Sequence, residues 1–197
     1  MKAAASRSDA QAKWLRISPG RHTGEGSGIG HEAHDHALSY LEVHVHTLVC
    51  PMKISIQSVP FNSSIGTLLR ASHLPTADLE AGTDVLFFAA GSADKPSGIV
   101  GLQIFGPIAL LRSLAVSEPE RRKGLGAVLV SYAEQHALSV GVHSIYLLTT
   151  TAARFFETRG YSHAKRSEAP TAIAATSQFS GLCPASSAFM VKEFDSQ

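Results

Sequence analysis

The chain has 197 residues, 44% of them hydrophobic, which is enough for one folded domain with a core and too few for two of ordinary size. Its 17 Lys and Arg residues against 16 Asp and Glu give a formal net charge of +1, which excludes a strong field for attracting nucleic acid or an anionic membrane. We therefore expect a small-molecule partner, no nucleic acid and no membrane, and the sequence leaves a homodimer open.

The cysteine content and the start of the chain bear on where the protein works. Cys50 and Cys183 lie far apart and form neither a metal-binding spacing nor a disulfide framework. The first twenty residues carry scattered charges without an apolar segment, so they do not resemble a secretory signal. These features predict a cytoplasmic protein.

Residues 1–51 are rich in His, Gly and Ser and predict a mostly disordered extension that precedes the domain at residues 52–197. Their histidines follow two short spacings, His31-x-x-His34-x-His36 and His44-x-His46. Such spacings suit two imidazoles on one metal, but no cysteine or defined scaffold accompanies them. Incidental binding is favoured over a native site, and no metal is assigned a catalytic role.

From residue 52 onward, the hydrophobic pattern alternates between strand and helix periods. The first half predicts a strand with alternating Ile54, Ile56 and Val59, a helix over 61–72 and a loop or short turn over 74–80. Strands over 85–90, 99–105 and 109–116 follow, and turn residues 91–98 join the strand at 85–90 to the strand at 99–105. The second half predicts a helix over 123–140 with Leu125, Val128, Leu129, Tyr132, Ala133 and His136 on its packed face, a strand over 144–148, a helix over 151–159, a helix from Pro170 to about 179 and a strand over 188–194.

Two of these expectations concern chain topology. The apolar window 98–116 contains Gln103 and Arg112 and is divided by Gly106-Pro107, so it predicts two buried strands and a tight turn, not a membrane span. The strand, helix, strand order over 109–148 implies a parallel crossover. The predicted fold class is α/β.

A basic, glycine-bearing turn lies between the strand at 109–116 and the helix at 123–140. Its residues are Arg121, Arg122, Lys123, Gly124, Leu125, Gly126 and Ala127. A strand that feeds such a turn places free backbone N–H groups and the positive end of a helix where phosphate oxygens can bind. The two glycines let a ligand approach the backbone closely, and the turn predicts a pyrophosphate site.

The spacing Arg121-x-x-Gly124-x-Gly126, directly after residues 114–120, resembles the acetyl-CoA pyrophosphate loop of the GNAT superfamily of N-acetyltransferases. The resemblance implies a mixed, mostly antiparallel sheet flanked by helices and splayed where acetyl-CoA, the co-substrate, inserts between two parallel strands. It implies that the backbone of Leu114 and Val116 pairs with the pantetheine arm. It assigns the pyrophosphate to Arg121, Arg122, Gly124, Leu125, Gly126 and Ala127.

Residues 147–161 resemble the superfamily's second cofactor-contacting segment, which implies contacts from Thr149 and Phe156. Phe156 stands where many members carry a tyrosine that protonates the leaving thiolate. Thr149 and Thr150 are the predicted catalytic hydroxyls, with Tyr161 nearby as another candidate and bulk water as an alternative. β-propensity and helix capping explain the threonines about equally well.

No residue of the sequence is an obvious general base either. Leu110 stands where some superfamily members carry a glutamate on the central strand. Asp78 and Glu80 are outside candidates, although a solvated loop in which Asp78 caps a turn is the favoured interpretation.

Arg112 and Ser113 on the central strand are the predicted acceptor-binding residues. A buried arginine needs either a structural carboxylate or a ligand anion, and an amino-acid carboxylate would satisfy it. A structural ion pair or exposure at a strand edge remains the alternative. Cys183 is interpreted as a small buried apolar side chain and not as a nucleophile.

Several segments resemble the arsenic-resistance N-acetyltransferase family: residues 74–79, 111–116, 146–152, 169–173 and 182–186. This narrower resemblance implies transfer of acetyl from acetyl-CoA, by direct attack, to the primary amine of a small molecule, an amino acid or an organoarsenical amino acid. A non-catalytic acyl-CoA-binding module is the alternative, and the missing tyrosine and glutamate favour it mildly.

Overall fold

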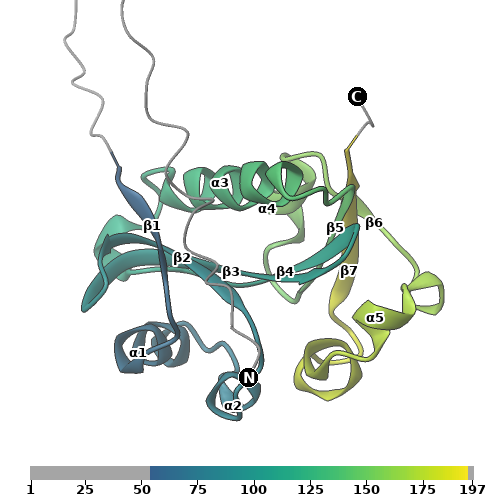
Figure 1. Ribbon diagram of the computed structural model, residues 1–197, viewed down its shortest axis with the longest axis horizontal. Helices are drawn as coiled ribbons and strands as arrows, with labels where there is room; N and C mark the ends of the chain where they lie inside the picture. Colours follow the sequence, from purple (N-terminus) through teal and green to yellow (C-terminus); the bar gives the residue numbers. More distant parts are fainter. Residues whose placement is uncertain (1–53, 195–197) are drawn as a thin grey trace, which may run out of the picture. The chain divides into compact units, whose positions relative to one another are not determined.

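The computed structural model describes residues 54–194, so the expectations for residues 1–51 lie outside the described residues. Residues 54–194 form a seven-stranded sheet in the order β1-β2-β3-β4-β5-β7-β6 with helices on both faces (Figure 1). All neighbouring strands are antiparallel except β4 and β5, which run parallel. The mixed, mostly antiparallel α/β fold is confirmed.

The strands are β1 (Ile56–Val59), β2 (Leu86–Ser92), β3 (Lys95–Phe105), β4 (Ile108–Val116), β5 (Ser144–Thr149), β6 (Ser162–His163) and β7 (Ala188–Glu193). The α-helices are α1 (Ser63–Ala71), α2 (Ala77–Glu80), α3 (Leu125–Ser139), α4 (Ala153–Glu157) and α5 (Thr171–Ala174). Short turns of other helical types are η1 (Glu118–Glu120), η2 (Arg166–Glu168) and the π-helical turn η3 (Gln178–Leu182).

Helices α3 and α4 cover one face of the sheet, while α1 and α2 lie against the other (Figure 1). Beneath α3, the side chains of Leu129, Val130 and Ala133 are fully buried against the sheet. On the opposite face, Ile65 and Leu69 of α1 are equally buried. Each buried leucine, isoleucine or valine contributes about 1.5–3 kcal/mol, so both helices are held firmly to the sheet that carries the site.

Three expectations about local structure are wrong. Residues 91–98 form mostly strand, because Gly91 pairs with Pro96 and Ser92 with Lys95, which leaves a two-residue turn at Ala93. On α3, Val128 and Tyr132 were expected inside but are 41% and 37% exposed, since the buried face is turned toward Val130 and Ala137.

The single helix expected from Pro170 to about 179 is instead divided into α5 and η3. The hydroxyl of Thr176 donates to the carbonyl of Ile173 at 2.7 Å and accepts from the amide of Phe179 at 3.3 Å. A threonine that bonds to the backbone in this way competes with the regular helical pattern, which explains the interruption.

The window 98–116 forms β3 and β4, as expected. Within residues 54–194, no helix combines the length and the apolar character needed to cross a bilayer.

Candidate active site

The two parallel strands separate partway along their length. Pairing between β4 and β5 begins at Ile108 with Ser144 and ends at Leu111 with Leu147. Strand β4 nevertheless continues to Val116, and β5 to Thr149. The predicted splay is therefore present, and the β5-facing edge of β4 is left without a ladder partner from residue 112 onward.

A β-bulge lies at the point where the strands separate. Gly101 of β3 pairs with Arg112 and Ile99 with Ala115, so Ser113 and Leu114 together stand opposite one residue. Ser113 has a φ of 56°, in the left-handed region. A bulge re-aims the strand, and a non-glycine residue in this region is a form of strain that concentrates at functional sites.

Leu114 has no register partner on either neighbouring strand. Val116 is only partly available, because its carbonyl accepts a hydrogen bond from Nε of Arg121 at 3.0 Å. The resemblance assigned both residues to the pantetheine arm, and the geometry suits Leu114 better than the Val116 carbonyl.

A cavity of about 650 Å³ lies at the splay. Its walls come from the end of α1 and the following loop, from β4, from β5 and the loop to α4, and from the segment around η3. The predicted residues on its surface are Arg112, Ser113, Leu114, Thr149, Thr150 and Phe156. The structure thus brings together residues from the predicted cofactor, acceptor and catalytic groups in one hollow.

The predicted pyrophosphate turn joins η1 to α3. Gly124 has a φ of 86° and an added Cβ would meet nothing within 4 Å, so a glycine is needed there for its conformation and not for space. Arg122 also lies in the left-handed region, with a φ of 64°. Arg121, Arg122, Lys123 and Gly124 are all exposed, so a ligand can reach the turn.

The backbone amides of residues 122–126 have no hydrogen-bond acceptor among residues 54–194. Two flanking amides are occupied: that of Arg121 donates to the Glu118 carbonyl at 3.2 Å, and that of Ala127 to the Gly124 carbonyl at 3.0 Å. The expected amide cluster is thus narrower than 121–127, and Arg121 can reach an anion only through its side chain. Successive free amides at the start of a 15-residue helix form a suitable anion site.

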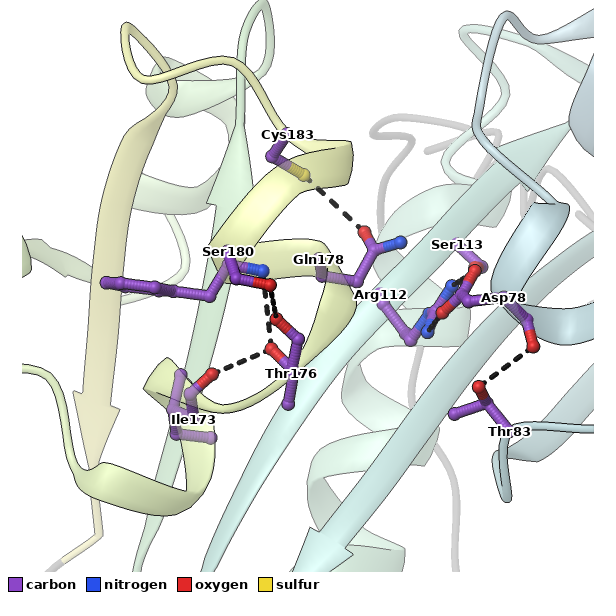
Figure 2. A network of polar contacts seen from close by, with 10 residues as sticks. Asp78, Thr83, Arg112, Ser113, Ile173, Thr176, Gln178, Ser180 and Cys183 are labelled. Carbon is purple, nitrogen blue, oxygen red and sulfur yellow. Dashed lines mark hydrogen bonds and ion pairs between the residues drawn. The ribbon is translucent and has the colours of Figure 1, made fainter. Parts of the chain in front are cut away.

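Arg112 is buried and already paired. Its guanidinium binds both carboxylate oxygens of Asp78, with Nη2 at 2.9 Å from Oδ1 (Figure 2). Arg112 is 5% exposed and Asp78 8% exposed. The structural ion pair is therefore the alternative that the structure shows, and a role for Arg112 in binding an acceptor carboxylate stays a prediction.

Neither outside candidate for the general base is suitably placed. Asp78 was interpreted as a turn cap in a solvated loop, but it is buried against Arg112 and does not line the cavity. Glu80 accepts from Arg70 at 2.9 Å and from the Thr76 hydroxyl at 3.0 Å, also away from the cavity. Leu110 is fully buried, so the central strand offers no base at that position.

The hydroxyl candidates differ in their placement. Thr149 and Thr150 line the cavity, and the Thr149 hydroxyl oxygen accepts from the amide of Ala152 at 3.0 Å, which is the capping role weighed from the sequence. Tyr161 is wrong as a catalytic candidate: it is 3% exposed, lies outside the cavity and packs against Phe156. Burial, with the nearby Glu134 carboxylate, raises the pKa of Tyr161 far above its ordinary value.

Four polar cavity residues were not singled out from the sequence: Ser72, His73, Gln178 and Ser187. His73 follows α1, is exposed and has a φ of 55°. The three non-glycine residues with positive φ among residues 54–194 are His73, Ser113 and Arg122. Because each lies at the cavity or the pyrophosphate turn, backbone strain is concentrated at this site.

Cys183 also lines the cavity and is only half-buried, so the expectation of a buried apolar side chain is wrong. Burial raises the pKa of its thiol; Asp78 adds to this rise, and Arg112 and Arg166 oppose it. The thiol therefore stays protonated at neutral pH and is a poor nucleophile, which agrees with its exclusion from that role.

A parallel strand pair that separates beside a glycine-bearing turn of free amides is the arrangement predicted for an acetyltransferase fold. The model of the acetyltransferase (GNAT) family matches residues 55–161, more than half of the chain. The chain belongs to this family.

One curated relative agrees with this assignment. An uncharacterized N-acetyltransferase from Chlorobaculum tepidum is 33% identical over 88 residues, which are 44% of this chain and 56% of that protein. The match thus spans little more than half of the relative's length.

Solved structures share the fold. N-acetylglutamate synthase from Neisseria gonorrhoeae, complexed with coenzyme A and N-acetyl-glutamate, gives a TM-score of 0.59 at 19% identity, over 72% of this chain and 36% of that one. An acetyltransferase from Streptococcus agalactiae gives 0.57 at 17% identity, over 73% of this chain and 99% of its own. At these identities the likeness establishes the fold.

Proposed function

We propose that the chain is an N-acetyltransferase that moves acetyl from acetyl-CoA to the primary amine of a small molecule by direct attack. The observation that carries this proposal is that two features occur together: free backbone amides at residues 122–126 and an edge of β4 without a strand partner. The amides suit a diphosphate, and the edge of β4 suits an extended amide-bearing arm. The side chains of Arg121 and Arg122 add positive charge beside the turn.

The acetyl group would then lie in the cavity near the bulge. We assign the backbone N–H of Leu114, a bulge residue without a register partner, to steadying the oxyanion that develops on the thioester carbonyl. The amine nitrogen forms a bond to the carbonyl carbon, the carbon–sulfur bond breaks, and the amine loses one proton. We assign that proton to His73, the histidine on the cavity wall, and we assign the hydroxyls of Thr149 and Thr150 to hydrogen bonding with the departing thiolate.

The proposed acceptor is an amino acid or an organoarsenical amino acid. This finer assignment is supported by the resemblance of five segments to the arsenic-resistance N-acetyltransferase family and by the polar wall that Arg112 and Ser113 contribute to the cavity. Residues 52–197 would form the whole N-acetyltransferase domain, and activity would therefore survive deletion of residues 1–51.

Release of the coenzyme A thiol from acetyl-CoA tests the proposal. The panel of acceptors should span common amino acids, glutamate analogues with phosphinate or arsinate groups, polyamines and aminoglycosides. Acceptor-dependent thiol release, with an N-acetylated product seen by mass spectrometry, is the expected result. Tight binding of acetyl-CoA with no thiol release for any acceptor would favour the acyl-CoA-binding module, which the phenylalanine at 156 and the leucine at 110 support.

A further inference from the structure

We infer that Gln178, held in orientation by Cys183, donates a hydrogen bond to the carboxylate of an amino-acid acceptor and selects for it. This inference rests on the proposed function and names a recognition residue for its substrate. Gln178 and Cys183 both line the cavity at the splay, opposite the wall that β4 contributes.

The π-helical turn η3 brings the two residues together. The amide of Cys183 donates to the backbone carbonyl of Gln178 at 3.0 Å, which is the five-residue spacing of a π turn. The same turn places Sγ of Cys183 at 3.5 Å from Oε1 of Gln178 (Figure 2). Single π turns are frequent at functional sites because they shift side chains out of the regular helical register.

The side-chain amide of Gln178 is only half satisfied. Gln178 is 7% exposed, and its Nε2 has no hydrogen-bond partner among residues 54–194. In Figure 2 this nitrogen points away from Cys183, toward the side of Arg112 and Ser113. A buried amide group without a partner is costly. A substrate group that accepts its hydrogen bond would therefore contribute more binding free energy here than the same contact would at an exposed site.

The contact with Cys183 determines which end of the Gln178 amide points toward Arg112 and Ser113. Burial raises the pKa of the Cys183 thiol, so sulfur retains its hydrogen and acts as a donor. A donor stabilises Oε1 at that position and disfavours the flipped amide, which would place Nε2 against the S–H group. Cys183 is therefore a positioning residue, and Nε2 remains directed toward the side of Arg112 and Ser113.

The charges around the cavity leave this role open to Gln178. Arg112 would be the obvious carboxylate ligand, but its guanidinium is committed to both oxygens of Asp78. The hydroxyl of Ser187, on a residue that is 5% exposed, is a second buried group on the cavity wall without a partner among residues 54–194. The wall thus offers neutral donors beside a neutralised arginine, and an amide N–H bound to a carboxylate is a charge-assisted hydrogen bond.

The test compares three forms of each common L-amino acid as acceptor: the free acid, its carboxamide and the amine that lacks the carboxyl group. Wild type should prefer the free acid. Gln178→Leu should raise KM for the free acid by about tenfold or more and leave KM for the decarboxylated amine within about twofold, because one charge-assisted hydrogen bond is lost. KM for acetyl-CoA should not change.

Three further variants separate recognition from a folding defect. Gln178→Glu should invert the preference toward the decarboxylated amine, since it places a carboxylate against the acceptor's carboxylate. Cys183→Ala should shift the preference in the direction of Gln178→Leu but less, and Cys183→Ser, which keeps a donor, should retain it. Gln135→Leu, at an exposed position of α3 outside the cavity, is the matched control and should behave as wild type.

An equal loss for all three acceptor forms or an unchanged preference in both Gln178 variants would overturn the inference and leave the proposed function standing. Thiol release with simple amines but no amino acid would overturn the inference and the proposed acceptor, and leave acetyl transfer to a primary amine standing. Failure of wild type to bind acetyl-CoA in a calorimetric titration would overturn the proposed function itself. The two failures are therefore distinguishable.

Discussion

Asp78 of α2 and Arg112 of β4 form a buried ion pair in which both carboxylate oxygens bind the guanidinium (Figure 2). The pair joins the short helix that follows the His73 loop to the strand residue directly before the bulge at Ser113. A buried guanidinium is costly unless its donors are satisfied, so the pair holds both walls of the cavity in a fixed relation.

Removing Asp78 should destabilise the protein strongly. We expect Asp78→Asn to lower the free energy of unfolding by about 3–5 kcal/mol, because it leaves the Arg112 charge buried and uncompensated. Glu80→Gln, in the same helix, is the matched control: its pair with Arg70 has side chains 55% and 53% exposed and should contribute about 0–1 kcal/mol. Urea unfolding measures both variants, and equal effects at the two positions would contradict the importance of burial.

The turn before α3 should be sensitive to any side chain at Gly124. Gly124→Val forces a β-branched residue into a φ of 86°, and the resulting shift of the free amides should weaken acetyl-CoA binding by at least about tenfold. Gly141→Val is a matched control at the other end of the helix, with a φ of 85° and nothing within 4 Å of an added Cβ. Both variants should lose similar stability, but only Gly124→Val should lose affinity for acetyl-CoA on calorimetric titration. Unchanged affinity of Gly124→Val would refute the pyrophosphate assignment.

The sequence was informative about the site where neighbouring residues determine the geometry. The turn around Gly124 is contiguous, so a strand, a left-handed glycine and a helix start can be predicted from adjacent residues. The succession of elements along the chain, apart from the two-residue strand β6, and the crossover from β4 to β5 follow from hydrophobic periods in the same way. The free amides were therefore predictable in outline, whereas the splay was implied only by the resemblance to the GNAT superfamily.

What remained hidden depends on residues that are distant in sequence or on single-residue irregularities. Asp78 and Arg112 are 34 residues apart, so their pairing required the folded chain. The bulge at Ser113 and the π turn at Gln178 each move side chains by one position, which no hydrophobic period records. The only local signal for His73 is its position, between the end of a helix and a Leu-Pro pair. A sharp change of chain direction at such a position favours a residue in the left-handed region, where His73 lies.

The proposed role of His73 can be tested without disturbing its backbone. His73→Asn is suitable because asparagine tolerates the left-handed region, where His73 has a φ of 55°. If His73 takes the proton of the amine, kcat should fall by about 10²–10⁴-fold with KM for acetyl-CoA unchanged. His163→Asn, at an exposed histidine on β6 that contacts Glu157 outside the cavity, should retain wild-type kcat. Full activity of His73→Asn would assign the proton to water.

His136 should make stability depend on pH. Its ring packs against Phe88, with centroids 4.9 Å apart, and burial lowers the pKa of His136 from its ordinary value of 6.5. The unfolded state therefore binds a proton more readily, so this contribution to stability is fully present above about pH 6.5 and is lost as the pH falls below that value. His136→Phe keeps an aromatic ring against Phe88 and removes the titration.

Between about pH 7.5 and 5.5, the free energy of unfolding of His136→Phe should therefore decline less than that of wild type when both are measured by urea denaturation. His143→Gln removes an exposed histidine just after α3 and should leave the wild-type decline unchanged. Parallel curves for wild type and His136→Phe would show that the packing of His136 on Phe88 does not disfavour its protonation. A decline that is smaller only in His136→Phe would link the α3 interface, which carries the pyrophosphate turn at its start, to acid sensitivity of the fold.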